Sequence, residues 1–89
     1  MPARRLRIAG YVQGVFFRAH TEERARELGI TGWARNAENG SVEIHAEGTD
    51  EALEQLEAWC HRGPAAATVL SVHTEDVPEE GYTSFEIRY

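Results

Sequence analysis

GYVQGVFFR, residues 10–18, is the stretch that decides the fold, because it joins the end of a β-strand to the start of an α-helix. Just before this stretch and at its start, apolar and polar side chains alternate with the period of a strand. Gly14 permits a turn with close backbone approach. From Phe17 onward, apolar residues recur at three- and four-residue steps, which is the period of a helix. The stretch therefore predicts a strand, a turn and a helix in succession.

The turn in this stretch is suited to an oxyanion. The start of a helix has unpaired backbone N–H groups and the positive end of the helix dipole, so a phosphate can bind there without a metal. Arg18 adds a planar guanidinium that can donate to two oxygens at once. We expect a phosphate to bind the Arg18 side chain and the backbone N–H groups of Gln13, Gly14, Val15, Phe16, Phe17 and Arg18. Taken alone, the stretch is equally typical of an ordinary β–α connection whose Val and Phe residues are core.

A second block of sequence follows the predicted helix. GWARN at residues 32–36 leads through Asn39 and Gly40 into SVEIHAEG at residues 41–48. This block resembles the acylphosphatase family, and the resemblance covers nearly the whole chain. It is also carried by QGV at residues 13–15, FR at residues 17–18, RGP at residues 62–64, Val69, Val72 and FEIRY at residues 85–89, whereas Phe16 contributes nothing to it. The resemblance implies a ferredoxin-like fold, a single acylphosphatase-like domain over residues 1–89, and acyl phosphates as the substrate class.

Asn36, at the end of the second predicted strand, is the candidate for orienting an attacking water. A neutral amide can orient water through its carbonyl oxygen while its N–H₂ group donates to a phosphate oxygen. On this residue alone, a hairpin asparagine that bonds its own backbone is the commoner arrangement. Beside the loop and the family pattern, we interpret Arg18 and Asn36 as the catalytic residues.

Hydrophobic periodicity predicts the other elements. One helix carries an apolar face and ends at Gly29, and strands follow over residues 30–36 and from residue 42, with a tight hairpin at Asn39-Gly40 between them. On the third strand, one set of side chains points inward (Val42, Ile44, Ala46) and the other outward (Glu43, His45, Glu47). A second helix, capped by Thr49 or Asp50, buries Leu53, Leu56, Trp59 and Cys60 and stops at Gly63-Pro64.

A fourth strand over residues 68–77 and a short last strand complete the order β-α-β-β-α-β plus a C-terminal strand. Two amphipathic helices must cover one face of the sheet to bury their apolar stripes. The fold class is therefore α+β, a ferredoxin-like sandwich with two helices on one face of a mainly antiparallel sheet.

The composition excludes several function classes. The 89 residues carry a net charge of −6, which argues against a nucleic-acid partner. All basic residues are Arg, so Schiff-base chemistry and a lysine-dependent phosphate loop are excluded. The single cysteine cannot form an intrachain disulfide, and no stretch is apolar enough for a signal peptide or a membrane span. We expect a cytoplasmic monomer that uses no cofactor.

Other candidate groups are weaker. His20 follows Arg18 closely, but its helical position is expected to face away, which favours packing or capping over a role as a base. The remaining histidines show no metal-ligand spacing, and Cys60 on an apolar stripe is expected to be a buried, inert thiol. The aromatic residues Tyr11, Phe16 and Trp33 are compatible with base stacking on a sheet, as in RNA-recognition modules of this fold, but the net charge disfavours it.

We therefore expect a metal-free hydrolase that cleaves acyl phosphates to a carboxylate and inorganic phosphate, with phosphate as product and competitive inhibitor. The alternative is a non-catalytic module that binds phosphate or carbamoyl phosphate, since acylphosphatase-like domains also open larger carbamoyl-transfer proteins. The presence of both Arg18 and Asn36 in an 89-residue chain favours the free enzyme.

Overall fold

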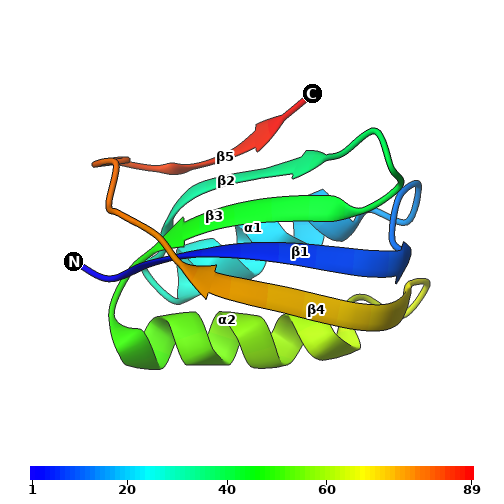
Figure 1. Cartoon of the computed structure of the whole chain (residues 1–89), viewed down its shortest axis with the longest axis horizontal. Coiled ribbons are helices and arrows are strands. Elements are labelled where there is room, and N and C mark those ends of the chain that lie inside the picture. The colour runs from blue at the N-terminus through cyan, green and yellow to red at the C-terminus, as the bar shows by residue number, and fades with distance from the viewer.

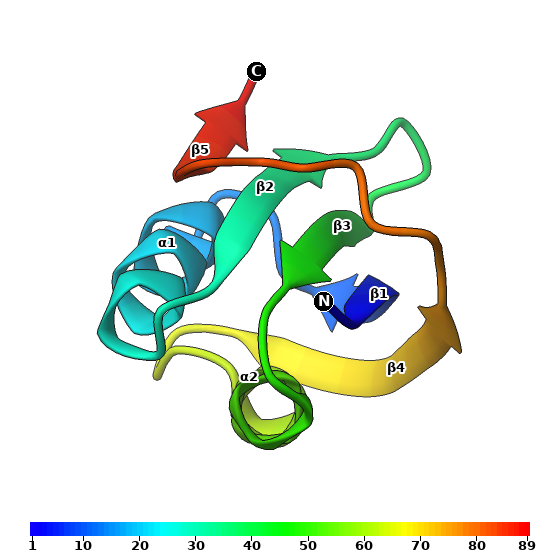
Figure 2. The same ribbon diagram turned by 90° about the vertical axis from the view of Figure 1, so that its left-hand side faces the viewer.

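The structure, a computed structural model, describes all 89 residues. Its elements follow the predicted order: β1 (Ala3–Tyr11), α1 (Phe17–Glu27), β2 (Thr31–Asn36), β3 (Val42–Glu47), α2 (Asp50–Arg62), β4 (Thr68–Asp76) and β5 (Phe85–Arg88). The strands form one sheet in the order β4-β1-β3-β2-β5, in which only the β2–β5 pair is parallel. Both helices lie on the same face of this sheet (Figures 1 and 2). The predicted ferredoxin-like sandwich is confirmed.

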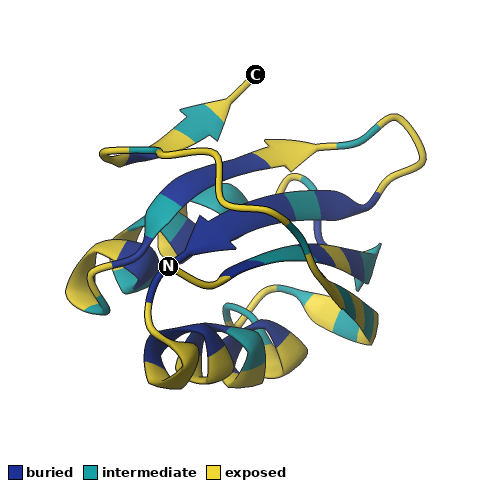
Figure 3. Ribbon diagram, turned by 60° about the vertical axis from the view of Figure 1, so that its left-hand side comes forward, coloured by how far each residue is buried: buried dark blue, intermediate teal, exposed yellow.

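The core lies between the two helices and the sheet. The inward side chains of β1 and β3 pack against one stripe of each helix, and Figure 3 shows the outer sides of both helices exposed. The Phe17 and Trp59 rings, 5.4 Å apart, join α1 to α2. Each fully buried side chain of this size contributes about 1.5–3 kcal/mol through the apolar surface that it removes from water. This packing fixes where α1 begins relative to the ends of β2 and β5. Neither helix has the length and apolar character that a membrane crossing requires.

The two helices begin differently. At α2, Thr49 is the N-cap residue, and its hydroxyl oxygen accepts a hydrogen bond from the Ala52 N–H at 3.1 Å, so Thr49 rather than Asp50 is the cap. At α1, the N-cap residue is Phe16, which offers no side-chain hydrogen bond, and the first turn holds no acidic residue. The start of α1 therefore keeps its unpaired N–H groups and its positive potential.

A β-bulge ends β1. The register against β4 shifts between Ala9 and Gly10, where the backbone φ of Gly10 is 134°. A Cβ at Gly10 would collide with the carbonyl oxygen of Thr68. Glycine is therefore required for this close approach, and the bend that accompanies a bulge directs the chain into the loop before α1.

The connection between β2 and β3 is longer than the predicted tight hairpin. Asn36 pairs with Val42, which leaves five residues, 37–41, between the strands. The Gly40 N–H donates to the Ala37 carbonyl oxygen and the Ala37 N–H donates to that of Ser41. Of the predicted Asn39-Gly40 pair, only Gly40 has a positive φ, 91°. The turn signal and the strand ends at Asn36 and Val42 were predicted correctly, and only the description of the connection as a tight hairpin was wrong.

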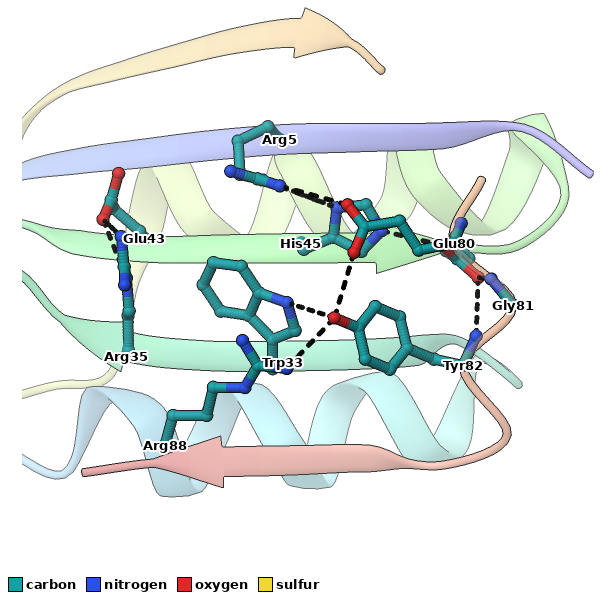
Figure 4. Close-up of polar contacts among 10 residues, drawn as sticks. Arg5, Trp33, Arg35, Glu43, His45, Glu80, Gly81, Tyr82 and Arg88 are labelled. Carbon is teal, nitrogen blue, oxygen red and sulfur yellow. Dashed lines mark hydrogen bonds and ion pairs between the residues drawn. The ribbon is translucent and has the colours of Figure 1, made fainter. Parts of the chain in front are cut away.

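The outward face of β3 is covered, although the alternation of its side chains predicts a solvated face. His45 and Glu47 are 0% and 1% exposed. Trp33 stacks on His45, and Tyr82 from the β4–β5 connection packs against it (Figure 4). Arg5 donates to Nδ1 of His45, so Nε2 carries the hydrogen that bonds Glu47 Oε2 at 2.8 Å. The prediction that these two side chains face water was wrong, because the connection between the edge strands crosses over them.

Glu47 anchors that connection. Its carboxylate accepts hydrogen bonds from three successive backbone N–H groups, those of Glu80, Gly81 and Tyr82, at 2.6–3.1 Å. Burial by itself raises the pKa of Glu47, but these bonds and the one from His45 together hold the pKa below its usual value. The ionised carboxylate therefore stabilises the fold.

We expect this stabilisation to be acid-sensitive. Because the folded pKa is lowered, the contribution of Glu47 is complete above its unfolded pKa of about 4.3 and is lost as pH falls through the folded value. Glu47→Gln should reduce the free energy of unfolding at pH 7 by about 1.5–3 kcal/mol, the range for hydrogen bonds to a charged group, and should flatten its decline below pH 4.3. Urea unfolding across pH measures both effects. Glu54→Gln, at an exposed position, is the control. If the free energy of unfolding fell equally steeply with pH in all three proteins, the stabilising role of Glu47 would be refuted.

Candidate active site

The loop between β1 and α1 presents a row of free backbone donors. None of the N–H groups of residues 14–19 donates to a protein acceptor, and the first intrahelical bond runs from the His20 N–H to the Phe16 carbonyl oxygen. Gly14 and Phe16 both have positive φ, 75° and 62°. Successive N–H groups around such a residue form a concave nest for an anion. The loop and the helix start thus leave backbone N–H groups free over the segment from which the sequence predicts donors to a phosphate.

Arg18 is held in place by the C-terminal strand. Its Nη1 donates to the carbonyl oxygen of Arg88 at 3.0 Å, and its guanidinium carbon lies 4.8 Å from the centroid of the Tyr89 ring. One N–H of the guanidinium is used in this way, and the others remain for an oxyanion. The first of these partners, Arg88, lies 70 positions away in the sequence and Tyr89 follows it, so local pattern could not reveal them.

The side chains of Asn36 and Asn39 have different hydrogen-bond partners. The side-chain oxygen of Asn39 accepts hydrogen bonds from the backbone N–H of Ser41 at 3.1 Å and from its hydroxyl at 2.6 Å. Asn39 is therefore the asparagine that stabilises the hairpin. Asn36 is exposed, its side chain makes no hydrogen bond within the protein, and it lines the pocket beside the loop. Its amide is free to contact a water and a phosphate oxygen.

A single pocket of about 410 Å³ brings these groups together. It lies between a loop wall, contributed by the β1–α1 segment, and a sheet wall, contributed by the ends of β2 and β5. Its lining consists of Val12, Gly14, Phe16, Phe17, Arg18, Ala19, Asn36, Ile87 and Tyr89. Of the residues proposed from the sequence, Arg18, Asn36, Gly14, Phe16 and Phe17 line the pocket. The other lining residues were not foreseen as parts of the site, because the sequence pattern gives them no chemical role: Val12, Ala19, Ile87 and Tyr89.

Gln13 and Val15 do not line the pocket but hold the loop. The Gln13 side-chain amide donates to the carbonyl oxygens of Ala37 and Ser41 at 2.8 and 2.9 Å. It therefore ties the start of the loop to the connection that follows Asn36. Val15 is 7% exposed and belongs to the core. The sequence assigned only backbone donors to these two residues and missed the positioning role of the Gln13 side chain.

The competing groups lie elsewhere. His20 is exposed and outside the pocket, so it does not pack as we expected. Cys60 is fully buried, and desolvation, with a smaller effect of the nearby Glu57 charge, raises the pKa of its thiol to about 12. A thiol with this pKa is protonated at neutral pH and is inert as a nucleophile. No three His, Cys, Asp or Glu side chains are placed to hold a metal ion.

The sheet face opposite the helices does not present a stacking platform for bases. Trp33 is only 4% exposed. The guanidinium carbons of Arg5, Arg35 and Arg88 lie 4.7–5.2 Å from its ring centroid, and Arg35 is also paired with Glu43 at 2.7 Å. The arginines are engaged with the aromatic ring and with carboxylates, and the ring itself is covered.

An α+β sandwich with a free N–H loop, a fixed arginine and an unpaired amide in one pocket has the groups that a small phosphoryl-binding protein needs. The acylphosphatase family profile matches residues 4–87. An acylphosphatase of Marinobacter nauticus is 49% identical over 81 residues, covering 90% of this chain and 88% of that protein. The chain belongs to the acylphosphatase family, and it is an enzyme that hydrolyses acyl phosphates.

Solved structures show the same similarity. The acylphosphatase of Bacillus subtilis aligns with a TM-score of 0.97 and 32% identity, and covers 100% of both chains. That of Coxiella burnetii aligns with a TM-score of 0.95 and 37% identity, and covers 98% of this chain and 92% of its own. The fold described above is therefore the fold of these enzymes.

Proposed function

We propose that the donors of the β1–α1 loop and Arg18 bind the phosphoryl group of an acyl phosphate while Asn36 orients the attacking water. The water oxygen forms a bond to phosphorus as the bond from phosphorus to the acyl oxygen breaks. The bonding electrons leave with the carboxylate, and the water proton passes to the phosphate or to solvent. The products are a carboxylate and inorganic phosphate.

The observation that supports this assignment is the convergence of Arg18 and Asn36 on one pocket with the N–H row. Phosphoryl transfer through a loose transition state requires mainly positioning and charge stabilisation. The guanidinium and the backbone donors supply the positive potential, and the amide supplies the position of the water. The residues that line the pocket include no carboxyl or imidazole side chain that could act as a general acid.

The absence of an acid in the pocket fits the substrate class. The carboxylate released from an acyl phosphate is stable as an anion at neutral pH, because carboxylic acids have pKa values near 4. A phosphate monoester releases a far more basic alkoxide, which needs a proton. The site should therefore hydrolyse mixed anhydrides and leave monoesters almost untouched.

Benzoyl phosphate with p-nitrophenyl phosphate as the monoester control tests this proposal. We expect turnover of benzoyl phosphate and little turnover of p-nitrophenyl phosphate. Inorganic phosphate should be a competitive inhibitor, because product and substrate bind the same site. Phosphate binding without turnover would instead favour the non-catalytic phosphate- or carbamoyl-phosphate-binding module.

Activity should not depend on a metal ion. Arg18 and the loop N–H groups already supply the positive potential that a metal would provide. Turnover of benzoyl phosphate should be unchanged after dialysis against EDTA and unaffected by added Mg²⁺ or Zn²⁺. Loss of activity on chelation, restored by a divalent ion, would replace this mechanism with metal-assisted hydrolysis.

We further propose that residues 1–89 act as one domain, as a monomer in the cytoplasm. A free thiol at Cys60 is compatible with a reducing compartment. Sedimentation equilibrium of the purified chain tests the oligomeric state.

A further inference from the structure

Phe16 combines two features that a residue serving only the fold would not have. Its φ of 62° lies in the left-handed region, which costs a non-glycine residue about 1–2 kcal/mol. Its side chain is also 76% exposed, so little apolar burial offsets that cost. Strain of this kind persists where the surrounding structure imposes it, and it concentrates at functional sites.

The strained backbone is explained by the anion nest, but the exposed ring is not. The nest requires the positive φ, and glycine would satisfy that without strain. Phe16 instead lines the loop wall of the active-site pocket. An exposed aromatic ring beside a phosphate site has apolar surface that can contact the acyl group of the substrate.

The in-line geometry of phosphoryl transfer restricts where the acyl group can lie. In phosphoryl transfer the attacking and leaving oxygens lie roughly in line through phosphorus. Asn36, which orients the water, belongs to the sheet wall of the pocket. Tyr89 lies on the same wall, since it follows Arg88, whose partner in the β2–β5 pairing is Arg35. The leaving carboxylate and its substituent must therefore point away from Asn36, and Phe16 is the exposed aromatic residue of the pocket that does not belong to the sheet wall.

Resting on the proposed roles of Arg18 and Asn36, we propose that Phe16 is the acyl-group contact and favours acyl phosphates with an aromatic or extended apolar substituent. Tyr89, the other exposed aromatic residue of the pocket, acts differently: it positions Arg18 through the cation–π contact. Phe16 thus affects which acyl group is preferred, whereas Tyr89 affects all substrates alike.

The test compares kcat/KM for benzoyl phosphate and acetyl phosphate in the wild type, Phe16→Ala and Tyr89→Ala. Phe16→Ala should lower the benzoyl value about tenfold, equivalent to about 1.4 kcal/mol, and the acetyl value less than about threefold. The inhibition constant of inorganic phosphate should not change, because phosphate has no acyl group. Tyr89→Ala should lower both values by the same factor and leave their ratio as in the wild type.

Phe16→Gly separates ring contact from backbone strain. Glycine removes the ring and also relieves the positive φ, whereas alanine removes the ring and keeps the strain. Both variants should lose benzoyl preference equally if the ring is responsible. An unchanged benzoyl-to-acetyl ratio in Phe16→Ala, or a larger change of that ratio in Tyr89→Ala, would overturn the assignment. A wild type that hydrolyses acetyl phosphate without preferring benzoyl phosphate refutes only the acyl contact, while a wild type that hydrolyses neither refutes the proposed function as well.

Discussion

Arg18→Lys should reduce kcat/KM for benzoyl phosphate by about 10²-fold or more, although it preserves the charge. The arginine donates to the Arg88 carbonyl oxygen and stacks on Tyr89 while further N–H groups remain for the phosphoryl oxygens. The compact ammonium of lysine has no planar fork and cannot satisfy both sets of partners. Charge stabilisation by a correctly placed arginine is among the largest contributions to phosphoryl transfer.

The control for this variant is Arg26→Lys, on the exposed side of the same helix, where the arginine is paired only with Glu22. We expect wild-type kinetics there. Circular dichroism establishes that both variants fold. If Arg18→Lys kept more than about a tenth of the wild-type kcat/KM, a loss of less than about 1.4 kcal/mol, a bidentate role for Arg18 would be untenable.

Asn36→Ala should lower kcat by about 10²–10³-fold, the effect of removing one preorganised polar group at an active site. The inhibition constant of phosphate should stay close to that of the wild type, because Arg18 and the loop hold the ground state while Asn36 acts in the transition state. Asn36→Asp should be no better than alanine. The new carboxylate could accept a hydrogen bond from water, but it would repel the phosphoryl group and lack the N–H₂ donor.

Asn39→Ala is the matched asparagine variant, because Asn39 bonds the hairpin backbone and Asn36 does not. Asn39→Ala should lower stability in urea more than Asn36→Ala does. A fully active Asn36→Ala would remove Asn36 from the mechanism, and a nearly fully active Asn36→Asp would show that it acts only as an acceptor.

Local patterns predicted most of the fold, because each element carries its own hydrophobic periodicity and its own cap or turn residues. The buried stripe of α2, its Thr49 cap and its Gly63 stop are all short-range features. The burial of His45 and Glu47 was not predictable in this way. It depends on the β4–β5 connection crossing the sheet and on backbone N–H groups more than 30 residues away.

The site, like the fold, combines features that local sequence reveals with features that depend on distant contacts. The loop, Arg18 and Asn36 stand in recognisable local sequence. The ordering of Arg18 by Arg88 and Tyr89, and the tether from Gln13 to the β2–β3 connection, follow only from strand pairing and chain crossing. The sequence assigned Phe16 a backbone donor but no contact with the acyl group, since neither its strain nor its exposure is visible without the backbone geometry.

Hydrolysis of benzoyl phosphate in ¹⁸O-labelled water tests most directly whether the oriented water attacks phosphorus. Mass spectrometry of both products after a single turnover shows which one carries the label. The site described here, with its donors around the phosphoryl group and Asn36 beside it, predicts the label in inorganic phosphate and unlabelled benzoate. Label in the benzoate would mean that water attacks the carbonyl carbon, which would contradict the roles assigned to Arg18 and Asn36.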